Sequence, residues 1–172
     1  MDLSNLVDLF ADPMELSEPL NELHVFLDWD NTILPNSYLT LQGYNLTAPR
    51  KIDVEIELRD LENVIINLFN TLLAFGKVFI ITNGDTGWVE LSARLFLPAI
   101  CPHLQRCSII SARGLYSLSF PHDALAWKRE AFRAHSNAKQ IISIGDSFTE
   151  REALFSLTEP KIKGNIKMHE YP

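Results

Sequence analysis

Cysteine and basic residues are scarce in this sequence of 172 residues. Its two cysteines, Cys101 and Cys107, lack the CxxC spacing of a metal site and are too few to cross-link a secreted domain. We therefore expect reduced, buried thiols. The 15 Lys and Arg residues are outnumbered by 22 Asp and Glu, which gives a formal net charge of -7. Nucleic acid is not an expected partner, because its binding depends on cations that neutralise phosphates.

Long hydrophobic runs are also missing. No stretch approaches the ~20 apolar residues of a membrane-spanning helix. The N-terminus, MDLSNLVDLFADPMELSEPL, carries acidic residues where an export signal carries basic ones. With 47% hydrophobic and 22% charged residues, the composition is that of a soluble globular domain. We expect a cytoplasmic protein with one hydrophobic core and no membrane span, and the sequence indicates no oligomeric state.

Short apolar runs recur along the chain and predict β-strands. Runs such as VFL, VFII and IISI are apolar throughout, as in parallel strands that are covered on both faces. The predicted strands cover residues 24–28, 77–82, 107–111, 140–145 and 163–170.

Helix-like stretches separate these runs. Apolar residues at helical spacing predict four helices, over residues 61–75, 87–96, 122–134 and 146–157. Gly76 is expected to end the first helix, and Asp146 can cap the first turn of the last. The alternation predicts an α/β fold with a doubly wound, mostly parallel, Rossmann-like sheet and a site at the carboxyl ends of its strands.

Two segments fall outside this alternation. Residues 38–58 contain Gly43, Pro49 and the alternating IDVEIEL, and predict a short β-hairpin flap after the first strand. Residues 1–22 are expected to be an N-terminal helical extension of the domain formed by residues 23–172. The sequence ends directly after the last predicted strand, without a closing helix, so we expect it to continue in a longer protein.

Polar residues stand where the predicted strands end. Carboxylates at the ends of neighbouring strands form the oxygen-rich site that Mg²⁺ prefers, and a threonine and a lysine add donors for a phosphate. Together they indicate phosphoryl transfer. The residues are Asp28 and Asp30 after the first strand, Thr82 at the end of the second, Lys128 before the fourth, and Asp146 with Glu150 after the fourth.

These residues lie in motifs that resemble a known superfamily. LDWDNT, FIITN, a lysine ahead of the fourth strand and IGDSFTE match, in order, the four signatures of the haloacid dehalogenase (HAD) superfamily. The resemblance spans most of the chain, with Glu150 in place of the usual second aspartate of the fourth signature. It implies a Mg²⁺-dependent phosphatase that works through an aspartyl-phosphate.

The resemblance also implies a role for each residue. Asp28 would be the nucleophile, Asp30 the general acid and base, and Lys128 the group that neutralises developing charge. Thr82 and the Asn83 backbone N–H would bind phosphoryl oxygens. Mg²⁺ would be held by Asp28, the Asp30 backbone carbonyl and Asp146, with Glu150 in an outer shell or holding Lys128.

Two of these assignments have rivals within the sequence. Lys139 directly precedes the fourth strand, but it lies at the entry of that strand, whereas Lys128 sits near the start of a helix as the lysine of the superfamily usually does. Thr82 could instead cap the following helix. We favour Lys128 and a phosphate-binding Thr82.

The spacing of the motifs also bears on the substrate. Only about 50 residues separate Asp28 from Thr82, too few for a large cap domain in addition to a helix. Superfamily members without a cap resemble one another in having open pockets, which suit a phosphate on a protein. We expect a phosphoprotein substrate, with a preference for phosphotyrosine if Trp29, Trp88 and Tyr44 line the site. The alternatives are a phosphatase of small metabolites and an inactive binding scaffold.

Overall fold

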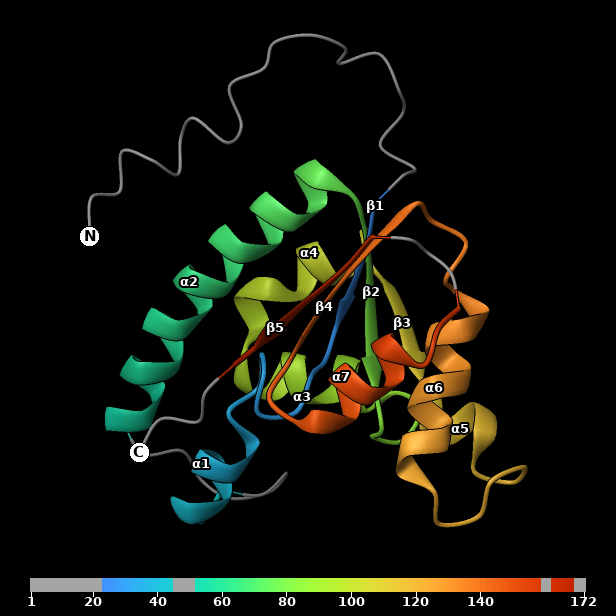
Figure 1. Cartoon of the computed structure of the whole chain (residues 1–172). Helices are drawn as coiled ribbons and strands as arrows, with labels where there is room; N and C mark the ends of the chain where they lie inside the picture. The colour runs from blue at the N-terminus through green and yellow to red at the C-terminus, as the bar shows by residue number, and fades with distance from the viewer. Residues whose placement is uncertain (1–22, 45–51, 159–161, 169–172) are drawn as a thin grey trace, which may run out of the picture.

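A five-stranded, all-parallel β-sheet forms the centre of the protein (Figure 1). The computed structural model describes residues 23–44, 52–158 and 162–168. The strand order is β3-β2-β1-β4-β5, so the order reverses between β1 and β4. In such sheets the crevice outside the carboxyl ends of the strands at the reversal is the usual ligand site. The strands are β1 (Leu23–Leu27), β2 (Lys77–Thr82), β3 (Ser108–Ser111), β4 (Gln140–Gly145) and β5 (Ile162–Lys167).

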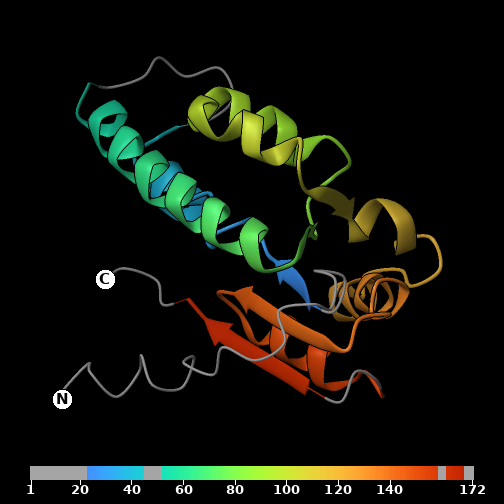
Figure 2. The same cartoon turned by 90° about the horizontal axis from the view of Figure 1, so that it is seen from above.

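Helices cover both faces of this sheet and bury a separate apolar cluster on each. On one face, α2 (Ile52–Phe75), α3 (Trp88–Phe96) and the short α4 (Cys101–Leu104) pack against Val25 and Leu27 of β1. On the other, α6 (Ala124–Ala134) and α7 (Phe148–Phe155) pack against Phe26 and Ile141. Figure 2 shows α2 and α3, in green and yellow-green, on the same side of the sheet. Successive residues of β1 therefore face opposite clusters, as the pleat of a strand requires.

The predicted strands and helices are present in the described residues, and apart from the start of α2 their boundaries shift by at most three positions. The prediction for the last strand reached residue 170, whereas β5 ends at Lys167 and residues 169–172 lie outside the described part. The last helix begins at Phe148 and is capped by Ser147, so the expectation that Asp146 caps it is wrong.

The β-hairpin predicted over residues 38–58 is wrong in its described parts. Residues 36–41 form α1 (Asn36–Leu41), and α2 begins at Ile52, nine residues before the predicted start. The sequence IDVEIEL fits a period of two, but only Val54 and Leu58 are buried, while Ile52 and Ile56 are 75% and 54% exposed. Burial every four residues is the pattern of a helix, so helical packing decided between the two periods.

Several smaller findings complete the comparison with the sequence. The structure adds α5 (Ala112–Tyr116), which the sequence did not predict. Cys101 and Cys107 are free thiols, as expected, but they are half-buried, whereas the sequence analysis expected them to be buried. The N-terminal extension, residues 1–22, lies outside the described residues. No helix in the described part of the chain is long and apolar enough to cross a membrane.

The helical register of residues 52–58 gives a test by substitution. In a hairpin, Ile56 and Leu58 would share one face, whereas in α2 Leu58 is 5% exposed and Ile56 is 54% exposed. We expect Leu58→Ala to lower the free energy of unfolding by about 2–4 kcal/mol and Ile56→Ala by less than about 1 kcal/mol, measured by urea denaturation. Equal losses in the two variants would contradict the helix.

Candidate active site

The turn after β1 fixes where Asp28 and Asp30 point. The Trp29 carbonyl accepts hydrogen bonds from the N–H groups of Ile33 and Leu34, and Asn31 has a positive φ of 59°. Asn tolerates this left-handed conformation better than most residues. Because side chains alternate along the strand, Asp28 lies on the same side as Phe26, whereas Trp29 lies with Leu27 in the opposite cluster. The turn thus places Asp28 toward α6 and α7.

A buried lysine binds the Asp28 carboxylate. Lys128 is 1% exposed, and its Nζ donates to Asp28 Oδ1 and to the Ile81 carbonyl, both at 2.6 Å. Its third contact is an ion pair with Glu150 Oε1 at 3.1 Å. An ammonium group has three N–H donors, so the described partners account for all of them. The other Asp28 oxygen, Oδ2, accepts a hydrogen bond from the Thr32 hydroxyl at 3.1 Å.

Charges in this network shift three pKa values in different directions. Burial raises the pKa of Asp28 to about 6, because desolvation and the negative charges of Glu150 and Asp146 together outweigh the attraction of Lys128. Burial opposes the charge of Lys128 as well, yet the two acids beside it raise its pKa. The pKa of Glu150 is lowered despite burial, since Lys128 and the Ser147 hydroxyl stabilise the carboxylate. Lys128 therefore stays charged, and Asp28 accepts a proton more readily than Glu150 does.

Glu150 is held in place from two sides. Its Oε2 accepts from the Ser147 hydroxyl at 2.5 Å and from the Ser147 N–H at 3.3 Å, which forms a capping box at the start of α7. A Cβ on Gly145 would lie 2.4 Å from Glu150 Cγ, so only glycine at this position leaves room for the Glu150 side chain. Of the two roles that the sequence allowed for Glu150, the structure shows the contact with Lys128.

Asp30 belongs to a second hydrogen-bonded group at the end of β2. Its Oδ1 accepts from Trp88 Nε1 at 2.9 Å, and its Oδ2 accepts from the Thr82 hydroxyl at 3.2 Å. The same hydroxyl accepts the Gly84 N–H at 2.8 Å. The N-cap of α3 is Gly87, so Thr82 does not cap that helix. Both oxygens of Asp30 are thus fixed by side chains from β2 and α3.

The remaining site residues of the sequence analysis are placed as follows. Trp29 is fully buried and donates from its indole N–H to Ser92 Oγ, so its ring has no exposed surface for a substrate. Trp88 is half-buried, and Asn83 donates to the Ala124 carbonyl. Asp146 lies close enough to Asp28 to raise its pKa. Lys139 precedes β4 at the amino end of the strands, away from Asp28.

The donors at this edge suit a hard cation such as Mg²⁺. Asp28 and Glu150 contact Lys128, and Asp146 lies close enough to raise the pKa of Asp28. In the described residues, no three His, Cys, Asp or Glu side chains converge as a metal-binding cluster. Mg²⁺ keeps several waters, however, and commonly takes only one or two protein carboxylates. Asp28, Asp146 and a backbone carbonyl can meet that requirement, since Glu150 is occupied by Lys128 and Ser147.

Comparison with known proteins gives no relative: no protein-family model, curated protein or solved structure matches this chain. The functional argument therefore rests on the geometry of the site and on the motifs in the sequence.

The hydrogen bond from Thr32 to Asp28 was not predicted. Thr32 completes the motif DWDNT, and its distance of four residues from Asp28 across a tight turn is the signal that could have indicated its hydrogen bond. The burial of Trp29 could be inferred from the sequence, because Leu27 and Trp29 share one side of an extended chain.

Replacement of Asp28 by Asn should stabilise the metal-free protein at neutral pH. Since folding raises the pKa of Asp28 from 3.8 to about 6, the free energy of unfolding of the wild type falls as the pH rises through this range. In Asp28→Asn the free energy of unfolding does not fall in this way, because the amide does not ionise, and Lys128 keeps Glu150 as its partner. We expect a gain on the order of 1 kcal/mol at pH 7.5 and little difference at pH 4, measured by urea denaturation with chelator present. A variant less stable than the wild type at pH 7.5 would contradict this electrostatic account.

Proposed function

We propose that this protein is a Mg²⁺-dependent phosphatase in which Asp28 attacks the phosphorus of a phosphate monoester. The observation that carries the proposal is the buried Lys128, which contacts Asp28 and Glu150 at the carboxyl end of β1 and β4. A fully buried lysine with two acids is costly to maintain for stability alone, and perturbed carboxylates of this kind are typical of catalytic sites. The HAD-like motifs lead to the same activity.

In the first step, a carboxylate oxygen of Asp28 forms a bond to phosphorus as the bond to the leaving oxygen breaks. The leaving oxygen takes a proton from Asp30, whose carboxyl group is held by the Trp88 indole N–H. Lys128 remains beside Asp28 and offsets the negative charge brought by the phosphate.

The second step returns the site to its initial state. Asp30, now ionised, takes a proton from water, and the water oxygen attacks phosphorus and breaks its bond to Asp28. Inorganic phosphate leaves, and Asp28 regains its carboxylate beside Lys128 and Thr32. In both steps the Thr82 hydroxyl, turned from Asp30, and the Asn83 N–H bind non-bridging oxygens.

A divalent cation has a defined place in this proposal. Asp28, Asp146 and the Asp30 backbone carbonyl would hold it. In the β-bridge between Asp30 and Leu34, the accepting carbonyls are those of Trp29 and Leu34, so the bridge does not use that of Asp30. When bound, Mg²⁺ supplies positive charge opposite the phosphoryl oxygens.

The proposed substrate is a phosphoprotein, and the proposed location of the enzyme is the cytoplasm. Between β1 and α2 the described residues form only α1 and turns, which leaves the site without a large cap over it in that part of the chain. The expected preference for phosphotyrosine depended on three rings, and Trp29 and Tyr44 are 0% and 7% exposed. We therefore propose a phosphoprotein substrate without a preference for phosphotyrosine.

Hydrolysis of an aryl phosphate tests the activity itself. We expect turnover by the wild type with Mg²⁺, none in excess chelator, and a fall of at least about 10³-fold in kcat for Asp28→Asn and about 10²-fold for Asp30→Asn. Lys139→Gln is the matched control for Lys128→Gln, and only the latter should lose activity. Full turnover by Asp28→Asn would remove the mechanism, and an inactive wild type that still binds Mg²⁺ would favour a binding scaffold.

The hydrogen bond from Trp88 to Asp30 gives a second test. Trp88→Phe removes the donor but keeps a ring, so Asp30 is less well aimed at the leaving oxygen. We expect kcat to fall about tenfold for alkyl phosphates and less for nitrophenyl phosphate, whose leaving group needs little help from an acid. Trp127→Phe, which removes an indole bond to the Phe120 carbonyl instead, is the control. Equal losses with both leaving groups would exclude this positioning role.

A further inference from the structure

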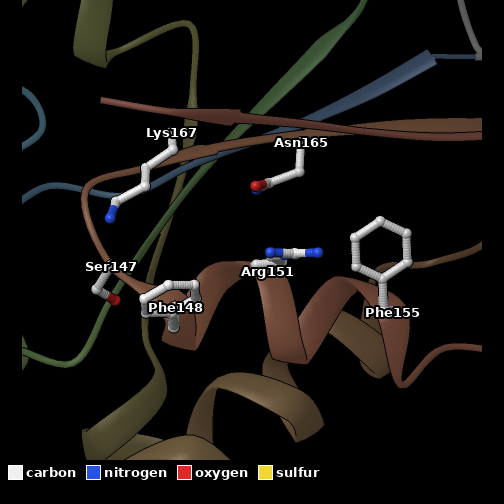
Figure 3. A pocket seen from close by; sticks show the side chains of 6 residues that line it. All are labelled: Ser147, Phe148, Arg151, Phe155, Asn165 and Lys167. Carbon is white, nitrogen blue, oxygen red and sulfur yellow. The ribbon is translucent and has the colours of Figure 1, made fainter. Parts of the chain in front are cut away.

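A pocket of about 350 Å³ lies beside the candidate active site, between α7 and β5 (Figure 3). Helix α7 contributes one face of the pocket, and Asn165 and Lys167, alternate residues of β5, project into it from the opposite face. The pocket is lined by Ser147, Phe148, Arg151, Phe155, Asn165 and Lys167.

Two cations without acidic partners dominate this pocket. In the described part of the chain, neither Arg151 nor Lys167 has a carboxylate within 4.0 Å, although the protein carries a net charge of -7. Each cation instead lies over an exposed ring. Lys167 Nζ is 4.7 Å from the centroid of the Phe148 ring, and Arg151 Cζ is 5.9 Å from that of Phe155. The rings hold both side chains over the pocket through cation–π attraction, and no acid of the described residues pairs with their N–H donors.

The pocket continues directly from the proposed catalytic edge. Ser147, at one end, follows Asp146 and shares the capping box with Glu150. The N–H of Met168, the residue after Lys167, donates to the Gly145 carbonyl at 2.8 Å. From Phe148 to Phe155 the helix rises about 10 Å, the length of about three residues of extended peptide. A peptide with its phosphate at Asp28 can therefore lay neighbouring residues along α7.

We propose that this pocket binds acidic side chains that flank the phosphorylated residue of a protein substrate. Arg151 and Lys167 supply the charge, and Asn165 projects from β5 beside Lys167 and across from Arg151. A nucleotide fits less well, because a base needs open ring faces and both rings already carry a cation. The inference rests on the proposed function and adds to it the class of sequence that the enzyme selects.

Pairs of phosphoserine peptides test this selection. The members of a pair differ only in two Glu or two Gln residues next to the phosphoserine, placed before it in one pair and after it in another. For the wild type we expect kcat/KM to be about tenfold higher for the acidic member of at least one pair, and this ratio to shrink in 0.5 M salt. The double variant Arg151→Gln/Lys167→Gln should bring the ratio near one. Arg94→Gln, an exposed cation on α3, should leave the ratio unchanged.

Reversal of charge and direct binding complete the test. Arg151→Glu/Lys167→Glu should prefer peptides with Lys in place of Glu. Fluorescence anisotropy of an unphosphorylated acidic peptide measures the pocket without turnover, and we expect the double Gln variant to bind it at least fivefold more weakly than the wild type. If the acidic peptide binds but no peptide is hydrolysed, the proposed function is refuted, and the inference that the pocket binds acidic side chains still holds. Equal affinity of the wild type for acidic and neutral peptides, or displacement by a nucleotide but not by the acidic peptide, would overturn the inference.

Discussion

The site depends on one buried cation shared by two carboxylates. Lys128 reaches from α6 to Asp28 of the β1 turn and Glu150 of α7, and also binds the Ile81 carbonyl at the end of β2. It therefore ties α6 to three other elements, β1, β2 and α7, near the reversal of strand order. Removal of the Lys128 charge would leave the Asp28 and Glu150 carboxylates buried without their cation, which is among the most destabilising changes in a protein. The same contacts that define the site thus also fix the packing of α6 and α7 on one face of the sheet.

Much of this arrangement could be predicted from sequence because apolar runs and polar strand ends are local signals. Runs such as VFII and IISI predicted β2 and β4, and the order of strands and helices predicted that Asp28 and Asp146 share one edge. The flap was wrong because IDVEIEL fits two periods, and only burial of Val54 and Leu58 shows which applies. The hydrogen bonds of Lys128 to the Ile81 carbonyl and of Trp88 to Asp30 depend on packing between distant segments, which no local pattern specifies.

The energetics of the site indicate function more than stability. The pKa of Asp28 is raised to about 6 by burial and by acids nearby, so the ionised form that a nucleophile needs is held at a cost to the folded state. Proteins keep such a cost mainly where it serves chemistry or binding. The exposed pocket along α7 follows the same principle, because Arg151 and Lys167 are left without acidic partners in an acidic protein. Both features agree with the proposed anionic substrate, lying across the ends of β4 and β5.

The most direct test of the account is to trap the phosphorylated side chain. Turnover of an aryl phosphate with Mg²⁺ would be quenched, the acyl-phosphate reduced with borohydride, and the peptides analysed by mass spectrometry. Reduction converts a phosphorylated aspartate to homoserine, and we predict this change at Asp28 and at no other acidic residue. Efficient turnover without any modified Asp28, or homoserine at Asp30 or Asp146 instead, would contradict the account.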